Sequence, residues 1–202
     1  MNIDLDKLKS VILSGGTISS NMCELRLVDA YDQNDAELIF RLRQQEKGNF
    51  LKKGSKTLNQ QIEYLKSYQK RFLDGKEIYY KIFDKKRASF EGVFRITQLD
   101  SAEALNWESL VVSKVCTPML PIDVMIMVYD ICFRVFCVTK CGPWEVRAAH
   151  HNMMKIHDFC KMYEVEKQTS KSFWISVSKA GYERQIDRFK KLGLGLALND
   201  RI

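Results

Sequence analysis

The side chains best suited to moving a proton lie in the second half of this 202-residue chain. Glu108 falls within a predicted strand over residues 105–113, and His150 and His151 follow a predicted strand over residues 144–149. A carboxylate, or an imidazole that titrates near neutrality, can serve as a general base. Each of the three can equally be an ordinary surface or hydrogen-bonded residue, and the sequence leaves that alternative open.

Basic residues are in excess, and the formal net charge is +7. A positive surface attracts anionic ligands such as a phosphorylated cofactor or a nucleotide-linked substrate, although solvated loops are the alternative explanation for each basic cluster. Acidic residues are interspersed and no nucleic-acid-binding motif accompanies the charge, so we expect no nucleic-acid partner. The clusters are Lys52, Lys53 and Lys56; Lys85, Lys86 and Arg87; and Lys190 and Lys191.

The six cysteines form no C-x-x-C pair, and no set of cysteines and histidines has zinc-site spacing, so we expect no metal site. Residues 1–20 lack the apolar core of an export signal, which favours free thiols and a cytoplasmic location. The most apolar stretch, residues 119–136, contains Asp123, Asp130 and Arg134. These charges predict a buried helix and not a membrane span.

Hydrophobic periodicity predicts one domain over residues 1–202, with a leading helix and loop over residues 1–20 and a flexible tail over residues 193–202. Between them strands and helices alternate in a way that is typical of a mixed α/β (α+β) domain with helices on both faces of one sheet. The predicted strands span residues 24–29, 78–84, 90–98, 105–113, 144–149, 164–169 and 172–178, and the predicted helices span residues 1–14, 34–45, 57–73, 121–136, 152–162 and 179–191.

Short motifs in this order resemble the GNAT superfamily of N-acyltransferases over residues 24–189. They are most similar to the branch that contains ribosomal-protein N-acetyltransferases and sugar N-acyltransferases of surface-polysaccharide pathways. Each motif alone is weak, and their order and spacing together carry the resemblance. The motifs are Leu25-Arg26-Leu27-Val28, Leu42-Arg43, Asn49-Phe50-Leu51, Gly92-Val93-Phe94-Arg95, Leu105-Asn106-Trp107-Glu108-Ser109, Thr117-Pro118, Tyr129-Asp130 and Asn152.

The resemblance implies a GNAT-like domain whose mostly antiparallel mixed sheet is splayed between two central strands. In the superfamily the acyl-pantetheine arm lies in that gap like an additional strand, and an amine attacks the thioester directly. Here the two strands would be residues 105–113 and 144–149, which makes Glu108, His150 and His151 the candidate bases. The donor is expected to be acetyl-CoA or another short acyl-CoA, with no metal.

The same resemblance implies which residues hold the donor. The backbone of Leu110, Val111 and Val112 would pair with the pantetheine amides, and Asn152 would bond the same arm unless it is a simple helix N-cap. Free amides at the start of the next helix would hold the pyrophosphate, because a helix N-terminus carries unpaired N–H groups and about half a positive charge. An ordinary loop before a buried helix is the alternative. The pyrophosphate residues would be Lys114, Thr117, Met119, Leu120 and Ile122.

The chain departs from the family pattern at two places, and a third position is unusual for an anion site. Residues 114–121 lack the glycines of the usual cofactor loop. Phe159 stands where many members have a tyrosine that protonates the departing thiolate, which leaves Tyr163 as a fourth polar candidate. Asp123 lies close to the expected pyrophosphate, so we expect it to cap the helix with its carboxylate turned away.

The acceptor is expected to meet the first two helices, the loop between them and the last strand pair. The leading hypothesis is acylation of the amine of a nucleotide-linked (dTDP) amino-deoxy sugar for lipopolysaccharide or O-antigen synthesis. An N-terminal protein acetyltransferase and a non-catalytic acyl-CoA-binding module are the alternatives, and a homodimer is one expected assembly. The expected acceptor contacts are Arg43, Asn49, Phe50, Tyr79 and Trp174.

Overall fold

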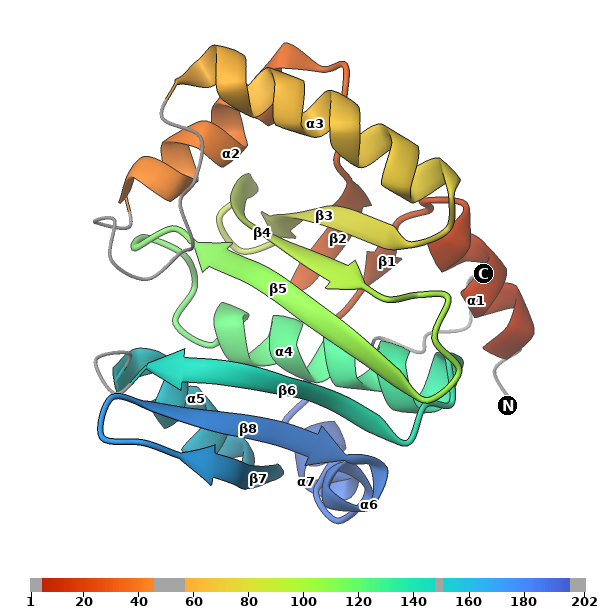
Figure 1. Cartoon of the computed structure of the whole chain (residues 1–202), viewed down its shortest axis with the longest axis vertical. Coiled ribbons are helices and arrows are strands. Elements are labelled where there is room, and N and C mark those ends of the chain that lie inside the picture. Colours follow the sequence, from red (N-terminus) through yellow and green to blue (C-terminus); the bar gives the residue numbers. More distant parts are fainter. Residues whose placement is uncertain (1–4, 46–56, 148–150, 197–202) are drawn as a thin grey trace.

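The fold is one twisted sheet of eight strands, seen in a computed structural model that describes residues 5–45, 57–147 and 151–196 (Figure 1). The strand order is β1-β2-β3-β4-β5-β6-β8-β7. Every neighbouring pair is antiparallel except β5 and β6, which are parallel. The strands are β1 (Ile18–Ser19), β2 (Cys23–Leu27), β3 (Glu77–Asp84), β4 (Ser89–Thr97), β5 (Ala104–Val112), β6 (Lys140–Arg147), β7 (Tyr163–Gln168) and β8 (Ser172–Ser178).

Helices cover both faces of the sheet, as the sequence predicted. Two of them, α2 and α3, pack over one face around Tyr79, Val93 and Val111. The others share the opposite face, where the larger part of the core lies. The helices are α1 (Leu5–Leu13), α2 (Gln33–Gln45), α3 (Leu58–Leu73), α4 (Leu120–Asp130), a π-helical turn η1 (Ile131–Val135), α5 (His151–Cys160), α6 (Lys179–Glu183) and α7 (Ile186–Lys191).

The central helix α4 is almost entirely buried, which agrees with its apolar sequence. Its two carboxylates lie in the interior, where they are hydrogen-bonded instead of solvated. Asp123 accepts one hydrogen bond from the Ser20 hydroxyl and another, 2.9 Å long, from the Gly195 amide. Asp130 accepts from the Tyr182 hydroxyl and from the Leu196 amide at 2.8 Å. We call these six residues the aspartate clamp.

The clamp bears on two predictions. Residues 193–196 belong to the predicted flexible tail, and the Gly195 and Leu196 amides are bonded to the carboxylates of α4. Asp123 does not cap the helix as predicted, because α4 has no side-chain cap and the Asp123 carboxylate is bonded to Ser20 and Gly195. Among the described residues, no helix is long and apolar enough to cross a membrane.

Other differences lie at element boundaries. The predicted last helix divides into α6 and α7, β6 begins four residues before its predicted start, and the two-residue β1 was not predicted. The Thr57 hydroxyl accepts a hydrogen bond from the Gln60 amide at 3.3 Å and so caps the start of α3, where the sequence predicted a helix to begin. The predicted fold class, a mixed α/β domain with a mostly antiparallel sheet, is also confirmed.

Candidate functional site

The two parallel strands at the centre of the sheet meet at one end only. β5 and β6 pair through Ala104 with Lys140 and through Leu105 with Cys141, and the remainder of β5 pairs with β4 alone. The strands then diverge, and α4 is seen across the opening between them (Figure 1). The predicted splay of the sheet between its central strands is therefore confirmed.

A bulge in β5 lies beside this opening. The register with β4 changes between the pair Arg95–Glu108 and the pair Val93–Val111, so β5 holds one additional residue. Ser109 takes a left-handed backbone conformation there, with φ of 56°. A bulge bends its strand and shifts the side-chain alternation by one position.

The bulge changes the faces on which the side chains of β5 lie. Simple alternation would place Glu108 and Leu110 on one face and Trp107 and Val111 on the other. Instead Trp107 and Leu110 share the α4 face, whereas Glu108 and Val111 share the face under α2 and α3. An aromatic surface and a charged surface therefore lie on opposite faces of the same short segment.

The backbone hydrogen bonds between β4 and the end of β5 show which backbone groups face the opening. The Ser113 amide donates to the Glu91 carbonyl at 2.6 Å, so Ser113 points toward β4. Because these groups alternate along a strand, Val111 also points toward β4, whereas Leu110 and Val112 point toward the opening. Two of the three residues predicted to pair with a pantetheine arm are thus suitably directed, and Val111 is not.

Four aromatic side chains pack on the α4 face where the strands part. The Trp107 and Trp144 rings have centroids 5.1 Å apart, and the His157 ring stacks 6.5 Å and 6.4 Å from them. Tyr129 of α4 lies 6.4 Å from Trp144 and is fully buried. Burial lowers the pKa of His157 to about 4, so its imidazole is neutral at pH 7. We call these four residues the aromatic floor.

The loop at the open end of the strands is held by Asp84. This carboxylate accepts from the Thr117 amide at 2.8 Å and from the Thr117 hydroxyl at 3.0 Å, as well as from the Lys86 and Arg87 amides. Burial opposes ionisation, but these hydrogen bonds, led by those from Thr117, hold the pKa of Asp84 below its usual value. The loop is therefore fixed to the basic tip of the β3–β4 hairpin.

Two predicted phosphate contacts are changed by these bonds. The Thr117 hydroxyl gives its proton to Asp84, so it has none to donate to a phosphate oxygen. The Leu120 amide donates to the Thr117 carbonyl at 2.9 Å and is likewise engaged. The predicted contacts of Lys114, which is exposed, and of the Met119 and Ile122 amides stay predictions.

A charged network occupies the other face of the bulge, under α2 and α3. Arg95 pairs with Glu77 at 3.0 Å and with Glu108 at 2.8 Å. Both Arg95 and Arg43 donate to the Ser109 hydroxyl at 3.3 Å. Arg71 completes the set through Glu77 at 2.6 Å. We call these six residues the arginine network.

The arginine network has unused capacity among the described residues. The buried Nε atoms of Arg43 and Arg95 have no hydrogen-bond partner in the part of the chain that the structure describes. The Glu108 side chain is 50% exposed, whereas that of Glu77 is 5% exposed. Glu108 is therefore the carboxylate of this network that an external molecule can reach.

The other predicted residues are not all brought to this site. Tyr79 is fully buried against Tyr68, with its pKa raised to about 12 by burial, and its ring lies 5.9 Å from the Arg95 guanidinium, so its side chain supports the arginine network from below and its role as an acceptor contact stays a prediction. Trp174 lies on β8, beyond β6, and stacks with Lys167. Three predicted residues, Asn49, Phe50 and His150, lie outside the described residues.

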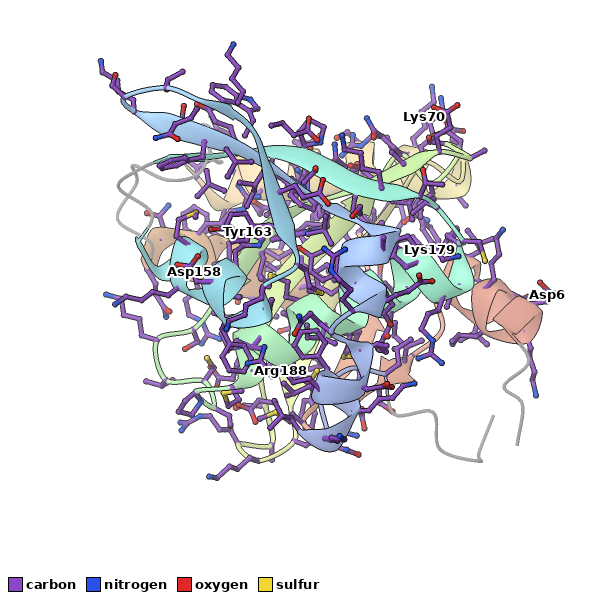
Figure 2. The ribbon with its side chains drawn as sticks, turned by 90° about the horizontal axis from the view of Figure 1, so that it is seen from below. Asp6, Lys70, Asp158, Tyr163, Lys179 and Arg188 are labelled. Carbon is purple, nitrogen blue, oxygen red and sulfur yellow. The ribbon has the colours of Figure 1, made fainter. Side chains whose placement is uncertain are left out.

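Two further predicted residues, His151 and Asn152, lie in the first turn of α5, but their side chains are outside the described part. Tyr163 donates its hydroxyl to Asp158 at 2.9 Å, and Figure 2 shows the two side by side. That bond is the first cause of its raised pKa, since the phenol is held protonated by the carboxylate. Tyr163 is thus poorly placed to give its proton to a thiolate.

Sequence reasoning missed Ser109, Arg95 and His157 as site residues. Arg95 and Ser109 stand inside the motifs that carried the family resemblance, which was the available signal for them. Nothing in the sequence indicated that Ser109 adopts a positive φ. His157 carries no motif, and only the packing of α5 brings it to the tryptophans.

Comparisons with known proteins identify the fold. No family model matches the chain, and no curated protein matches it. Among solved structures, the apo form of FdhC, a nucleotide-linked sugar GNAT, is 20% identical with a TM-score of 0.73, covering 88% of this chain and 98% of that one.

Two other similar structures are an N-acetyltransferase, PseH, from Campylobacter jejuni in complex with acetyl coenzyme A and a spermidine N-acetyltransferase, SpeG, from Vibrio cholerae. PseH is 13% identical with a TM-score of 0.58, covering 78% of this chain and 99% of that one. SpeG is 11% identical with a TM-score of 0.62, covering 80% of this chain and 96% of that one. The chain has the GNAT fold, which confirms the resemblance at the level of structure.

Proposed function

We propose that this chain is an acyl-CoA-dependent N-acyltransferase that acylates the amine of a nucleotide-linked amino-deoxy sugar. The observation that carries the proposal is the separation of β5 and β6 after two residue pairs. It leaves the backbone groups of Leu110 and Val112 directed into the opening without a strand opposite them. A pantetheine arm is an extended chain with amide groups, so it can bond these positions as a strand would.

The charge of the arginine network supports an acceptor that carries negative charge. Three arginines (Arg43, Arg71 and Arg95) stand against two glutamates (Glu77 and Glu108), which gives +3 − 2 = +1. A nucleotide diphosphate is attracted by this excess, whereas a polyamine is repelled. The structural likeness to a nucleotide-linked sugar GNAT points in the same direction.

The reaction requires a neutral amine and a route for one proton. The amine nitrogen attacks the thioester carbonyl carbon, the C–N bond forms, the C–S bond breaks, and the thiolate leaves with the sulfur electrons. One proton must leave the nitrogen, and one must reach the sulfur. Glu108 is the described carboxylate that can accept the first proton, because Arg95 orients it and half of the side chain is accessible.

At the open end, the proposed phosphate contacts are Lys114 and the amides of Met119 and Ile122 at the start of α4. His150, His151 and Asn152 keep the roles predicted for them from the sequence. We also propose a cytoplasmic location and a homodimer. Native mass spectrometry would test the homodimer directly.

Calorimetry with CoA and acetyl-CoA, followed by a turnover assay, tests the function. We expect binding of both CoA and acetyl-CoA and transfer of the acyl group to at least one dTDP-amino sugar in a panel. Transfer to free peptide N-termini and to no sugar would contradict the acceptor and favour the N-terminal acetyltransferase. CoA binding without turnover of any amine would favour the non-catalytic module, and no binding at all would overturn the proposal.

A further inference from the structure

The aromatic floor lies at the inner end of the opening between β5 and β6. Trp107 comes two residues after Leu105, the last residue of β5 that pairs with β6, and Trp144 comes three residues after its partner Cys141. On the proposed function, the phosphates lie at the open end of the strands and the thioester at this inner end. We infer that Trp107 and Trp144 close the acyl pocket and limit the donor to acetyl-CoA.

The packing of the floor leaves no space for a longer chain. Indole rings with centroids 5.1 Å apart are in contact, so no methylene fits between Trp107 and Trp144. His157 stacks on both rings from the side of α5, and Tyr129 closes the side of α4. Because protein interiors are close-packed, a longer chain would enter only by displacing these rings.

The indole of Trp144 indicates that packing alone does not account for its presence. Its buried Nε1–H has no hydrogen-bond partner among the residues that the structure describes. A buried unpaired donor destabilises a protein, and phenylalanine would fill much of the same space without one. The ring area of tryptophan beyond that of phenylalanine is what closes the inner end of the opening.

The neutrality of His157 fits an apolar floor. Its ring is 2% exposed, and burial keeps it uncharged at pH 7. The floor therefore presents ring faces and edges to the acyl group and no charge. Such a surface suits a methyl group and holds no cation to pair with a carboxylated acyl chain.

Calorimetry of a donor series tests the inference without knowledge of the acceptor. The series is CoA, acetyl-CoA, propionyl-CoA, butyryl-CoA and hexanoyl-CoA. We expect acetyl-CoA to bind best and affinity to fall at least tenfold by butyryl-CoA. An open apolar pocket would instead give a gain of about fourfold per methylene.

Two variants and a control make the result specific. Trp144→Ala opens the floor, and Trp107→Phe removes less volume and serves if the first variant fails to fold. Both should bind CoA as the wild type does and should recover at least tenfold in affinity for butyryl-CoA. Tyr31→Ala, at an exposed aromatic side chain outside the floor, should leave the series unchanged.

The outcomes separate this inference from the proposed function. Affinity that stays level or rises with chain length in the wild type, together with normal CoA binding, would overturn the inference alone. Variants that bind CoA and still reject butyryl-CoA would also overturn it. Failure of the wild type to bind CoA itself would overturn the proposed function and this inference with it.

Discussion

Two polar clusters of this domain differ in how fully their hydrogen-bonding groups are paired. In the aspartate clamp each carboxylate oxygen of Asp123 and Asp130 accepts at least one hydrogen bond. In the arginine network two buried guanidinium nitrogens have no partner among the described residues, and Glu108 is half-exposed. A polar cluster that is complete by itself fixes a structure, whereas one with groups left over is suited to an incoming molecule.

The position of each cluster agrees with this difference. The clamp joins Ser20, which precedes β2, and Gly195, which follows α7, to the buried helix α4. The arginine network lies at the bulge of β5, where the strand turns Ser109 and Glu108 to one face. We therefore expect changes in the clamp to affect stability and changes in the network to affect turnover.

The largest expected effect is on stability, from Asp130→Ala. It leaves the Tyr182 hydroxyl and the Leu196 amide buried without their acceptor. Loss of one partner in such a cluster costs about 3 kcal/mol in the free energy of unfolding. Urea unfolding followed by circular dichroism measures it. Asp187→Ala, at an exposed residue of α7 that lies 4.0 Å from Lys190, is the matched control and should change little.

A change below about 1 kcal/mol for Asp130→Ala would show that the clamp is not a stabilising element. A folded variant with normal stability and lost turnover would reverse the roles of the two clusters.

The next effect is on turnover, from Glu108→Gln. The amide keeps the shape of the side chain but cannot take a proton, so we expect kcat/KM to fall about 100-fold, or about 2.7 kcal/mol in the barrier. The free energy of unfolding should change by under about 1 kcal/mol, because the Glu108 side chain is 50% exposed. Rates are measured with acetyl-CoA and the acceptor found in the turnover panel.

Glu183→Gln, at an exposed position of α6, is the control for the loss of one carboxylate. An unchanged rate for Glu108→Gln across the pH profile would exclude Glu108 as the base and leave His150 and His151 as the candidates.

The clamp should also show a pH dependence of defined sign. Burial is the first cause that raises the pKa of Asp123 and of Asp130 above the ordinary value of 3.8. The folded state then binds these protons more tightly than the unfolded state, so stability falls as pH rises from 3.8 through the raised values. The double variant Asp123→Asn, Asp130→Asn lacks this dependence.

The measured quantity is the difference in unfolding free energy between the wild type and this double variant at several pH values. His157 contributes a slope of the opposite sign below about 6.5, but it is present in both proteins and cancels. We expect the wild type to lose stability relative to the double variant as pH rises. A wild type that gains stability relative to the double variant would contradict the assigned direction.

The sequence predicted the elements well because periodicity and turn residues are local. The strands on either side of the opening, the helix α4 and the cap at Thr57 all follow from residues close to one another in the chain. The family resemblance then placed Glu108 and Arg43 near the reaction. Each of these inferences needed only a short window or a motif.

What the sequence could not supply depends on register and on distant partners. One additional residue in β5 reverses the face on which Leu110 lies, and no composition rule indicates a serine at positive φ. The engagement of Thr117 depends on Asp84, which is 33 positions away. The role of Asp123 depends on Gly195, 72 positions away, so it could not be read from the first turn of its helix.

The smallest expected effect concerns the backbone at the bulge. Ser109 has φ of 56°, a conformation that costs an L-residue about 1–2 kcal/mol, whereas glycine adopts it freely. Ser109→Gly and Ser109→Ala both remove the hydroxyl that Arg43 and Arg95 share, so the difference between them isolates the backbone. After the greater flexibility of unfolded glycine is included, Ser109→Gly should be more stable than Ser109→Ala by about 0.5 kcal/mol.

The matching position in the clamp is Gly195, with φ of 93°. A Cβ there would lie 2.5 Å from an Asp130 carboxylate oxygen, so Gly195→Ala should destabilise the fold by about 2 kcal/mol. The clamp thus has glycine at its position of positive φ, whereas the arginine network has serine at its own. If Ser109→Ala proved as stable as Ser109→Gly, the bulge would be unstrained, and unpaired groups alone would distinguish the arginine network from the clamp.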